Sequence, residues 1–356
     1  MGRYLVASDL HISDQVTQGR SRLQDGVRLL LEVFRTAKRE RCFEVILAGD
    51  VVHQKNRFAL STWLAVQEAL RLTGMRVWWL RGNHETPTPS DILNTPIRLM
   101  SAPHVETVLG RYVVDADPAA DCVLAFLPWF EGEDYLLELA HLKEEVRPYK
   151  KRILISHIGV QGGVVSGSNF SPASRVTLKD LNPSFWTFVL LGDYHKHQKL
   201  APNVMYLGAP VSHCFGDDHH GFVWVLDTDA MTVKKAMLGE TFPQFFTAGV
   251  FTDEDRDYWV ERAKFEEQGR DYLRFVAPVE YHAPLQRAWP KAKVVSPSDT
   301  VVEIEEDESR LSLDEKTSFE TLVARYVKHK GIPKEHQGRL SGMMLEEIHS
   351  YLKGAE

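Results

Sequence analysis

Short apolar runs alternate with amphipathic helical patterns over the first 240 residues. Most runs are continuous stretches of Val, Ile, Leu and aromatic residues, which is typical of strands buried on both faces. They begin at Arg3, Cys42, Met75, Cys122, Arg152, Trp186, Val204 and Gly221. Apolar residues at helical spacing, such as Leu23, Val27 and Leu30, lie between the early runs. The pattern predicts a layered α/β domain over residues 1–240.

The pattern changes after Thr241. Residues 241–306 alternate more weakly and predict a small α/β appendage, which ends in an acidic, polar stretch. Residues 307–356 predict a linker and then two amphipathic helices, with Gly331 closing the first and Pro333 opening the second. An amphipathic pair at the end of a linker docks either on its own domain or on a partner.

Polar residues follow five of the apolar runs. Because ligands of α/β sheets bind beyond the carboxyl ends of the strands, we expect these side chains to converge. Carboxylate, imidazole and amide groups without a thiolate suit Mn²⁺, Mg²⁺, Fe²⁺ or Zn²⁺, and this number of ligands exceeds the needs of one ion. The segments are Asp9-Leu10-His11, Gly49-Asp50 with His53, Gly82-Asn83-His84-Glu85, Ser156-His157 and Gly192-Asp193-Tyr194-His195.

A two-ion site predicts hydrolysis of a phosphate ester by a metal-activated hydroxide. Two cations about 3.5–4 Å apart, bridged by a carboxylate and a water, lower the pKa of that water from about 15.7 to roughly 7. Hydroxide then attacks a phosphate in line, and a nearby imidazole protonates the departing alkoxide. Each segment alone has an ordinary reading, because Gly-Asp is a common turn and a strand-end histidine is often a buried core residue. The five together, in this order, favour the metal site.

Composition limits how the chain can bind nucleic acid and in which cellular compartment we expect it. The chain has 42 basic and 49 acidic residues, a net charge of −7, so bulk electrostatics does not hold it on nucleic acid. A polyanionic substrate would need a local patch, metal ions or a partner. No apolar run reaches the roughly 18 residues of a membrane span, and the N-terminal residues do not resemble a signal peptide. Three cysteines without a CxxC pair argue against a disulfide framework, so we expect a cytoplasmic protein.

The five segments resemble the signature of the calcineurin-like metallophosphoesterases over roughly residues 1–230. The resemblance implies a four-layer sandwich, two sheets flanked by helices, with a two-metal site. The stretches GDVVHQKN, SHIGVQGG, GDYHKHQ and YLGAPVSHCFGDDHHGFVWVLD are similar to the SbcD-type nuclease subunit of recombination complexes, including phage versions. That family carries a small α/β capping domain and a C-terminal helical tail.

The narrower resemblance implies a function and partners. It implies a metal-dependent DNA exonuclease and endonuclease of recombination and repair, associated with the nucleoid of a bacterial or phage-infected cell. Residues 241–306 would form the capping domain that contacts DNA. Residues 307–356 would bind an SMC-like ABC ATPase, with two nuclease chains forming a homodimer within a heterotetramer. The expected cofactors are two divalent ions, Mn²⁺ before Mg²⁺.

The resemblance also assigns roles to residues. Asp9, His11 and His195 would hold one ion, Asn83 and His157 the other, with Asp50 bridging, His84 as general acid and His53 steering the strand. Asp193 departs from the family pattern, because it stands where the first histidine of Gly-His-x-His is usual. We expect this carboxylate to ligate and to favour harder ions; the alternative is a second ion that lacks one ligand.

Other charged residues are open to two readings. Arg57, Arg81 and Lys196 lie near the motifs and predict a local phosphate track, although ordinary surface charge explains them as well. The Asp- and His-rich segment 216–221 is interpreted as a solvated turn. A stand-alone phosphoesterase for small substrates is the main alternative function, and the appendage and tail argue against it. A catalytically dead scaffold is disfavoured because the motif residues are intact.

Overall fold

The computed structural model describes residues 2–53, 59–87, 95–100, 104–117, 121–165, 174–266 and 269–297. The predicted helical tail, the end of the appendage and Arg57 lie outside these residues. Among the described helices, none combines the length and the apolar character needed to cross a bilayer.

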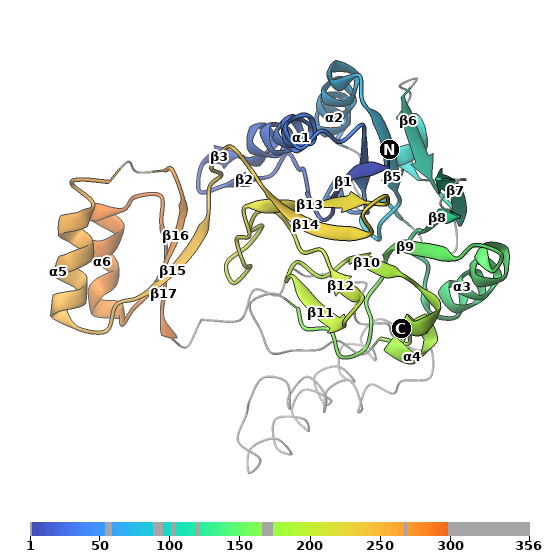
Figure 1. Ribbon diagram of the computed structural model, residues 1–356. Helices are drawn as coiled ribbons and strands as arrows, with labels where there is room; N and C mark the ends of the chain where they lie inside the picture. The colour runs from blue at the N-terminus through green and yellow to red at the C-terminus, as the bar shows by residue number, and fades with distance from the viewer. Residues whose placement is uncertain are drawn as a thin grey trace, which may run out of the picture. The chain divides into compact units, whose positions relative to one another are not determined.

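The first six-stranded sheet contains the N-terminal strand (Figure 1). β1, β4, β5 and β6 run parallel, and β13 joins β1 in an antiparallel pair. This arrangement places the carboxyl ends of the three strands that carry the first three motifs side by side. In spatial order the strands are β14 (Thr232–Met237), β13 (Phe222–Asp227), β1 (Arg3–Ala7), β4 (Glu44–Leu47), β5 (Arg76–Leu80) and β6 (Val105–Val108).

The second six-stranded sheet carries the remaining two motifs. Its four central strands are parallel, and each edge strand pairs antiparallel with its neighbour. In spatial order the strands are β11 (Gln198–Ala201), β12 (Val204–Tyr206), β10 (Phe188–Gly192), β9 (Lys151–His157), β8 (Cys122–Leu127) and β7 (Tyr112–Asp117).

Apolar side chains form three cores that separate four layers. Leu5 belongs to the core between the first sheet and its helices, whereas Val6 belongs to the core between the two sheets, together with Ile155. Tyr135 and Leu191 belong to the third core, beneath the helices of the second sheet. The predicted sandwich of two sheets flanked by helices is confirmed. The helices are α1 (Arg22–Arg39), α2 (Leu60–Thr73), η1 (Pro96–Leu99), α3 (Gly132–Val146), α4 (Leu178–Leu181) and η2 (Pro183–Phe185).

The appendage has a parallel three-stranded sheet and a core of its own. The two helices pack together, and Phe275, Leu285 and Trp289 are buried in that core. A capping box between Thr252 and Asp255 fixes the start of the first helix. The elements are β15 (Phe245–Gly249), α5 (Asp253–Arg262), β16 (Tyr272–Val276), α6 (Val279–Ala288) and β17 (Lys293–Val295).

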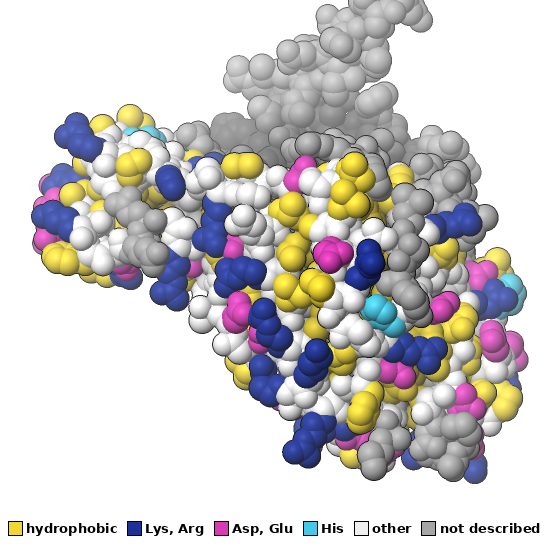
Figure 2. Space-filling model, turned by 90° about the horizontal axis from the view of Figure 1, so that it is seen from above, with side chains coloured by type: hydrophobic (Ala, Val, Ile, Leu, Met, Phe, Trp, Pro, Cys, Tyr) yellow, Lys and Arg dark blue, Asp and Glu magenta, His cyan; other side chains and the backbone are white. Residues whose placement is uncertain are grey.

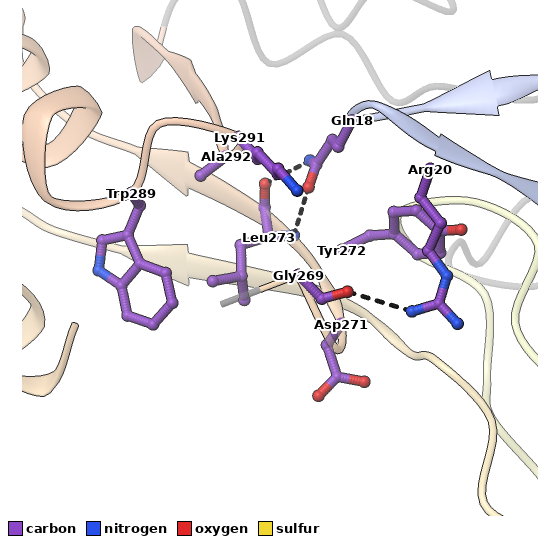
Figure 3. A pocket seen from close by; sticks show the side chains of 9 residues that line it. All are labelled: Gln18, Arg20, Gly269, Asp271, Tyr272, Leu273, Trp289, Lys291 and Ala292. Atoms are coloured by element: carbon purple, nitrogen blue, oxygen red, sulfur yellow. Dashed lines mark hydrogen bonds between the residues drawn. The ribbon is translucent and has the colours of Figure 1, made fainter. Parts of the chain in front are cut away.

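Polar contacts attach the appendage to the main domain, and two of these attachments lie close to the sequence connection and to the first motif. The connection after β14 is fixed to α1, because the backbone N–H of Gly239 donates to the buried carboxylate of Glu32 over 2.7 Å. The hairpin of β2 (Val16–Thr17) and β3 (Arg20–Ser21) makes the second attachment (Figure 3). There the Gln18 amide donates to the backbone oxygen of Leu273 over 2.7 Å and accepts its N–H over 3.2 Å.

Candidate metal centre

The five motifs converge where strands of both sheets end. β1, β4 and β5 deliver the first three motifs from one sheet, and β9 and β10 deliver the last two from the other. Four of the candidate ligands have a backbone conformation that non-glycine residues rarely adopt: φ is +57° at Asp9, +44° at His11, +51° at Asp50 and +97° at Asp193. Strained backbone of this kind is found preferentially at functional sites.

Glycines in the motifs leave room for the ligands. A Cβ atom on Gly82 would stand 2.1 Å from Oδ1 of Asp50, and one on Gly49 would stand 2.2 Å from Nδ1 of His157. A Cβ on Gly192 would also meet Nδ1 of His157, at 2.6 Å. These three glycines are therefore needed for the close approach of backbone to ligand.

Asp9, His11 and His195 form the first group of candidate ligands. One potential donor atom from each lies within 4.8 Å of the others. The Nε2 atoms of His11 and His195 are 3.0 Å apart, as two ligand atoms on one ion would be. These are the residues to which the resemblance assigned the first ion.

Asn83, His157 and Asp50 form the second group of candidate ligands. Nε2 of His157 lies 3.1 Å from Oδ1 of Asn83 and 3.3 Å from Oδ2 of Asp50. Oδ1 of Asp193 lies 4.0 Å from the same nitrogen, and its side chain is buried. Asp193 is thus within reach of the second group, and its ligation stays a prediction.

Asp50 occupies the centre of the cluster. Its Oδ2 faces Nε2 of His157 at 3.3 Å, of His11 at 3.7 Å and of His84 at 3.9 Å. Burial alone would raise the pKa of Asp50, but His157 and His84 outweigh burial and hold that pKa below its usual value. The carboxylate is therefore ionised and faces both groups, as a bridging ligand must.

The donor set fits divalent cations. Oδ2 of Asp9 is buried without a hydrogen-bond partner, and burial raises the pKa of this carboxyl group. Burial, together with the neighbouring histidines, lowers the pKa of His11 well below its usual value, which keeps its imidazole neutral. An orphaned carboxylate oxygen beside the neutral imidazole of His11 fits a cation, and oxygen and nitrogen donors suit Mn²⁺, Fe²⁺ or Zn²⁺.

The histidines of the centre have partners on their second ring nitrogens. Nδ1 of His157 lies 2.8 Å from the backbone oxygen of Ala48, and Nδ1 of His84 lies 2.7 Å from that of His53. A carbonyl oxygen only accepts, so Nδ1 is the protonated nitrogen in both rings and Nε2 faces the cluster. Nδ1 of His11 lies 3.1 Å from Nδ1 of His53. His53 therefore orients two rings: its imidazole orients the candidate ligand His11, and its backbone oxygen orients His84.

Glu85 of the third motif is buried and binds backbone N–H groups of two motifs. Its carboxylate accepts backbone N–H groups of Asp50, Val52 and Gly82 at distances of 3.0, 3.0 and 2.8 Å. Burial, together with the nearby Asp50, raises the pKa of Glu85 to about 7. Glu85 therefore ties the second motif to the third.

The substrate-binding prediction is wrong for Arg81. Its side chain is fully buried, and its guanidinium donates to Oγ1 of Thr86 and to the backbone oxygen of Leu109. It holds the loop after β5 and has no surface to offer a phosphate. Lys196 is half-buried directly after His195, where its phosphate role stays a prediction. Arg57 lies outside the described residues.

Two functional neighbours were missed from the sequence, His213 and Asp217. Nε2 of His213 is 2.8 Å from the backbone oxygen of Asp9, and Oδ2 of Asp217 is 3.1 Å from Nδ1 of His195. The interpretation of segment 216–221 as a solvated turn is wrong for Asp217, whose side chain is 4% exposed. The available signal was the density of Asp and His residues in this segment, which its turn-like composition masked.

The chain is similar to one protein family and to several solved structures. Residues 2–196, more than half of the chain, match the calcineurin-like phosphoesterase family. None of the curated proteins compared matches the chain. Similar solved structures include a dimetal phosphatase from Danio rerio, with 12% identity, 67% of this chain and 99% of that chain covered and a TM-score of 0.42. They also include TT1561 of Thermus thermophilus, with 13% identity, 66% and 98% coverage and a TM-score of 0.40.

The family match spans all five motifs completely, so it covers the strand ends that build the candidate metal centre. The chain belongs to the calcineurin-like phosphoesterase family, whose members are dimetal-dependent hydrolases of phosphate esters.

Proposed function

We propose that this phosphoesterase is a DNA nuclease that hydrolyses phosphodiester bonds in recombination and repair in the cytoplasm. The observation that carries the proposal is the position of His84 at the metal centre. Its Nε2 lies 3.9 Å from the central Asp50 oxygen, while Nδ1 is held by a backbone carbonyl. A proton donor is therefore fixed beside the place where a phosphate would be hydrolysed.

In the proposed reaction, the metal ions and the side chains of the protein have different roles. Two divalent ions, when bound by the candidate ligands, lower the pKa of water and neutralise phosphate oxygens. His84, when protonated, carries its second proton on Nε2 and can give it to the departing alkoxide. The carbonyl of His53 keeps the His84 ring in this orientation. His53 is half-buried and stacks on His84 with ring centroids 5.0 Å apart, so it stands where it could direct a bound strand.

Mn²⁺ is the proposed ion, with Mg²⁺ as the alternative. The centre has several buried carboxylate, imidazole and amide donors and no thiolate among its described residues. Asp193 replaces an imidazole by a carboxylate, which moves the preference toward harder ions. Mn²⁺ accepts both oxygen and nitrogen donors, whereas Mg²⁺ prefers oxygen alone.

The appendage supports a polymeric substrate. Arg274 of β16 lies over the ring of Phe215 at 4.7 Å, and Phe215 belongs to the loop that also carries Asp217. A basic side chain of the appendage sheet therefore lies next to the loop that borders the metal centre, where it could contact the phosphates of a nucleic-acid strand. On the face shown in Figure 2, basic side chains are scattered among acidic ones, so we expect short-range contacts to hold DNA rather than a broad positive field.

The test is digestion of labelled linear and hairpin DNA in Mn²⁺, Mg²⁺ or EDTA, beside bis-p-nitrophenyl phosphate and p-nitrophenyl phosphate. We expect Mn²⁺-dependent cleavage of DNA that EDTA abolishes. His84→Gln should lower turnover by about 10²–10⁴-fold with the metals still bound, because a positioned acid contributes that much. His141→Gln, at an exposed position of α3, is the matched control. Cleavage of the small esters alone would favour the stand-alone phosphoesterase.

The partner is proposed on the resemblance of the motif stretches, because the family that they resemble carries a C-terminal helical segment that binds an ATPase. Residues 307–356 would bind an SMC-like ABC ATPase, and the nuclease would act as a homodimer within the resulting heterotetramer. Deleting residues 309–356 should abolish co-purification with a co-expressed ATPase of this type. Cleavage of bis-p-nitrophenyl phosphate by the truncated chain should persist, since every candidate ligand precedes residue 200.

A further inference from the structure

The loop between β12 and β13 places a buried carboxylate behind one candidate metal ligand. Oδ2 of Asp217 lies 3.1 Å from Nδ1 of His195, on the opposite side of the ring from Nε2. The same oxygen accepts the backbone N–H groups of His213 over 2.9 Å and of Cys214 over 3.3 Å. The side chain of Asp217 is 4% exposed, whereas Asp218 is less buried. This carboxylate is therefore fixed by the loop and is directed at His195.

We propose that Asp217 is the positioning residue of the first metal site. An acceptor on Nδ1 fixes the proton there and leaves the lone pair on Nε2, which lies 3.0 Å from Nε2 of His11. A carboxylate behind a ligating imidazole also makes that imidazole a stronger donor. Asp217 itself does not ligate, because it contacts the ring edge that faces away from His11. The inference rests on the proposed metal chemistry and not on DNA as the substrate.

The three candidate histidine ligands have three different hydrogen-bond partners on Nδ1. His157 has the backbone oxygen of Ala48, His11 has the imidazole of His53, and His195 has Asp217. Among the described contacts of these rings, only the one behind His195 brings a full negative charge. Asp217 therefore acts selectively on the ion held by Asp9, His11 and His195, and we expect the other ion to be almost unaffected.

The loop is held in place by contacts that do not involve Asp217. Nε2 of His213 lies 2.8 Å from the backbone oxygen of Asp9, and Arg22 donates to the backbone oxygen of His213 over 2.7 Å. Phe215 packs against Phe245 of β15, with ring centroids 5.1 Å apart. A substitution that preserves the shape of Asp217 should therefore leave the loop folded.

The experiment measures Mn²⁺ binding to the full-length, metal-free chain by titration calorimetry, with thermal unfolding of the same samples. Asp217→Asn keeps an oxygen for the two backbone N–H groups and removes the charge. We expect one of two Mn²⁺ equivalents to weaken by about 10–100-fold, the usual effect of losing such a partner. The other equivalent and the unfolding temperature of the metal-free chain should stay unchanged. Asp218→Asn, one residue along, should bind both equivalents like the native chain.

The outcomes separate this inference from the proposed function. Two equivalents in the native chain and the same two affinities in Asp217→Asn would overturn the positioning role alone. Equal weakening of both ions with a lower unfolding temperature would overturn it too, because that is the effect of a merely structural residue. If Asp217→Asn does not fold, Asp217→Ser decides the question by the same criteria. A native chain that binds no Mn²⁺ would overturn the metal chemistry itself.

Discussion

At the scale of single residues, Gly82 shows how tightly the site is packed. A methyl group at this position would stand 2.1 Å from Oδ1 of Asp50 and 2.5 Å from its backbone nitrogen. Neither atom can move without displacing the central ligand. Gly82→Ala should therefore lower Mn²⁺ affinity and phosphodiesterase turnover by at least about 100-fold, since misplacing a reacting group by about 1 Å has this effect. Gly110→Ala, where no atom lies within 4 Å of the added carbon, is the control for calorimetry and kinetics.

Glu32 gives a prediction about pH. Its carboxylate is 2% exposed and accepts hydrogen bonds from Gly239, Thr36 and Arg39, which outweigh burial and lower its pKa in the folded chain. The contribution to stability is therefore complete above the unfolded-state pKa of about 4.3 and is lost as the pH falls through the lower folded-state value. Glu32→Gln should lower the free energy of unfolding by about 2 kcal/mol at about pH 7.

The same comparison at low pH checks the sign. The difference between native and Glu32→Gln chains in urea should shrink as the pH falls below about 4, because the carboxyl group is protonated first in the unfolded chain and then, at lower pH, in the folded chain. Glu68→Gln, on the exposed face of α2, should show no difference at either pH. A difference that grows in acid would contradict the account.

The site residues that could be predicted are those that a local sequence pattern places at the end of a strand. Asp9, Asp50, Asn83 and His157 lie at or directly after the ends of buried strands, so their side chains had to lie at strand ends. The sequence does not show the direction of a side chain, and for this reason Arg81 was misassigned although it stands two residues before Asn83. The contacts of His213 and Asp217 depend on how a loop folds back over β1, and no local pattern encodes that.

At the scale of elements, the β2–β3 hairpin joins the metal centre to the appendage. It follows the His11 motif closely, and the amide of Gln18 makes two hydrogen bonds with the backbone of Leu273 (Figure 3). Gln18→Ala removes both, each contributing about 1 kcal/mol. Hydrogen exchange at the Leu273 amide should rise about 10-fold. Val16→Ala, at a 69% exposed position of the same hairpin, should leave this exchange unchanged.

A second readout separates local from global effects. Exchange in β9, within the second sheet, should be the same in Gln18→Ala as in the native chain, since neither of these two hydrogen bonds reaches it. Faster exchange throughout the molecule would mean that the hairpin supports the whole fold rather than the attachment of the appendage.

The strands that could be predicted are the interior ones. The eight apolar runs correspond to β1, β4, β5 and β13 of the first sheet and to β8, β9, β10 and β12 of the second. The four strands that the runs missed are β6, β14, β7 and β11, which are the edges of the two sheets. An edge strand is half exposed, as the sequence TVKKAM of β14 shows, and so lacks a continuous apolar run.

At the scale of the whole molecule, the metal centre joins the two sheets. Asp9 and Asp50 come from the first sheet, and His157 and Asp193 come from the second. Motif order alone could not show this division, because strand ends of one parallel sheet would converge in the same way. The division came from the family resemblance, which implied two sheets, and the three separate cores confirm it.

Because ligands of both sheets surround the candidate ions, metal binding should stabilise the whole sandwich. The carboxylates of Asp9, Asp50 and Asp193 are all buried, donor oxygens of Asp9 and Asp50 lie within 4.8 Å of each other, and Oδ2 of Asp9 has no hydrogen-bond partner. An ion at about 1,000 times its dissociation constant adds about 4 kcal/mol to the free energy of unfolding. Urea unfolding in Mn²⁺ should therefore show a higher midpoint than in EDTA. In Asp50→Asn, which weakens the shared ligand, we expect the gain from Mn²⁺ to be lost; a gain equal to that of the native chain would mean that Asp50 does not join the two ions.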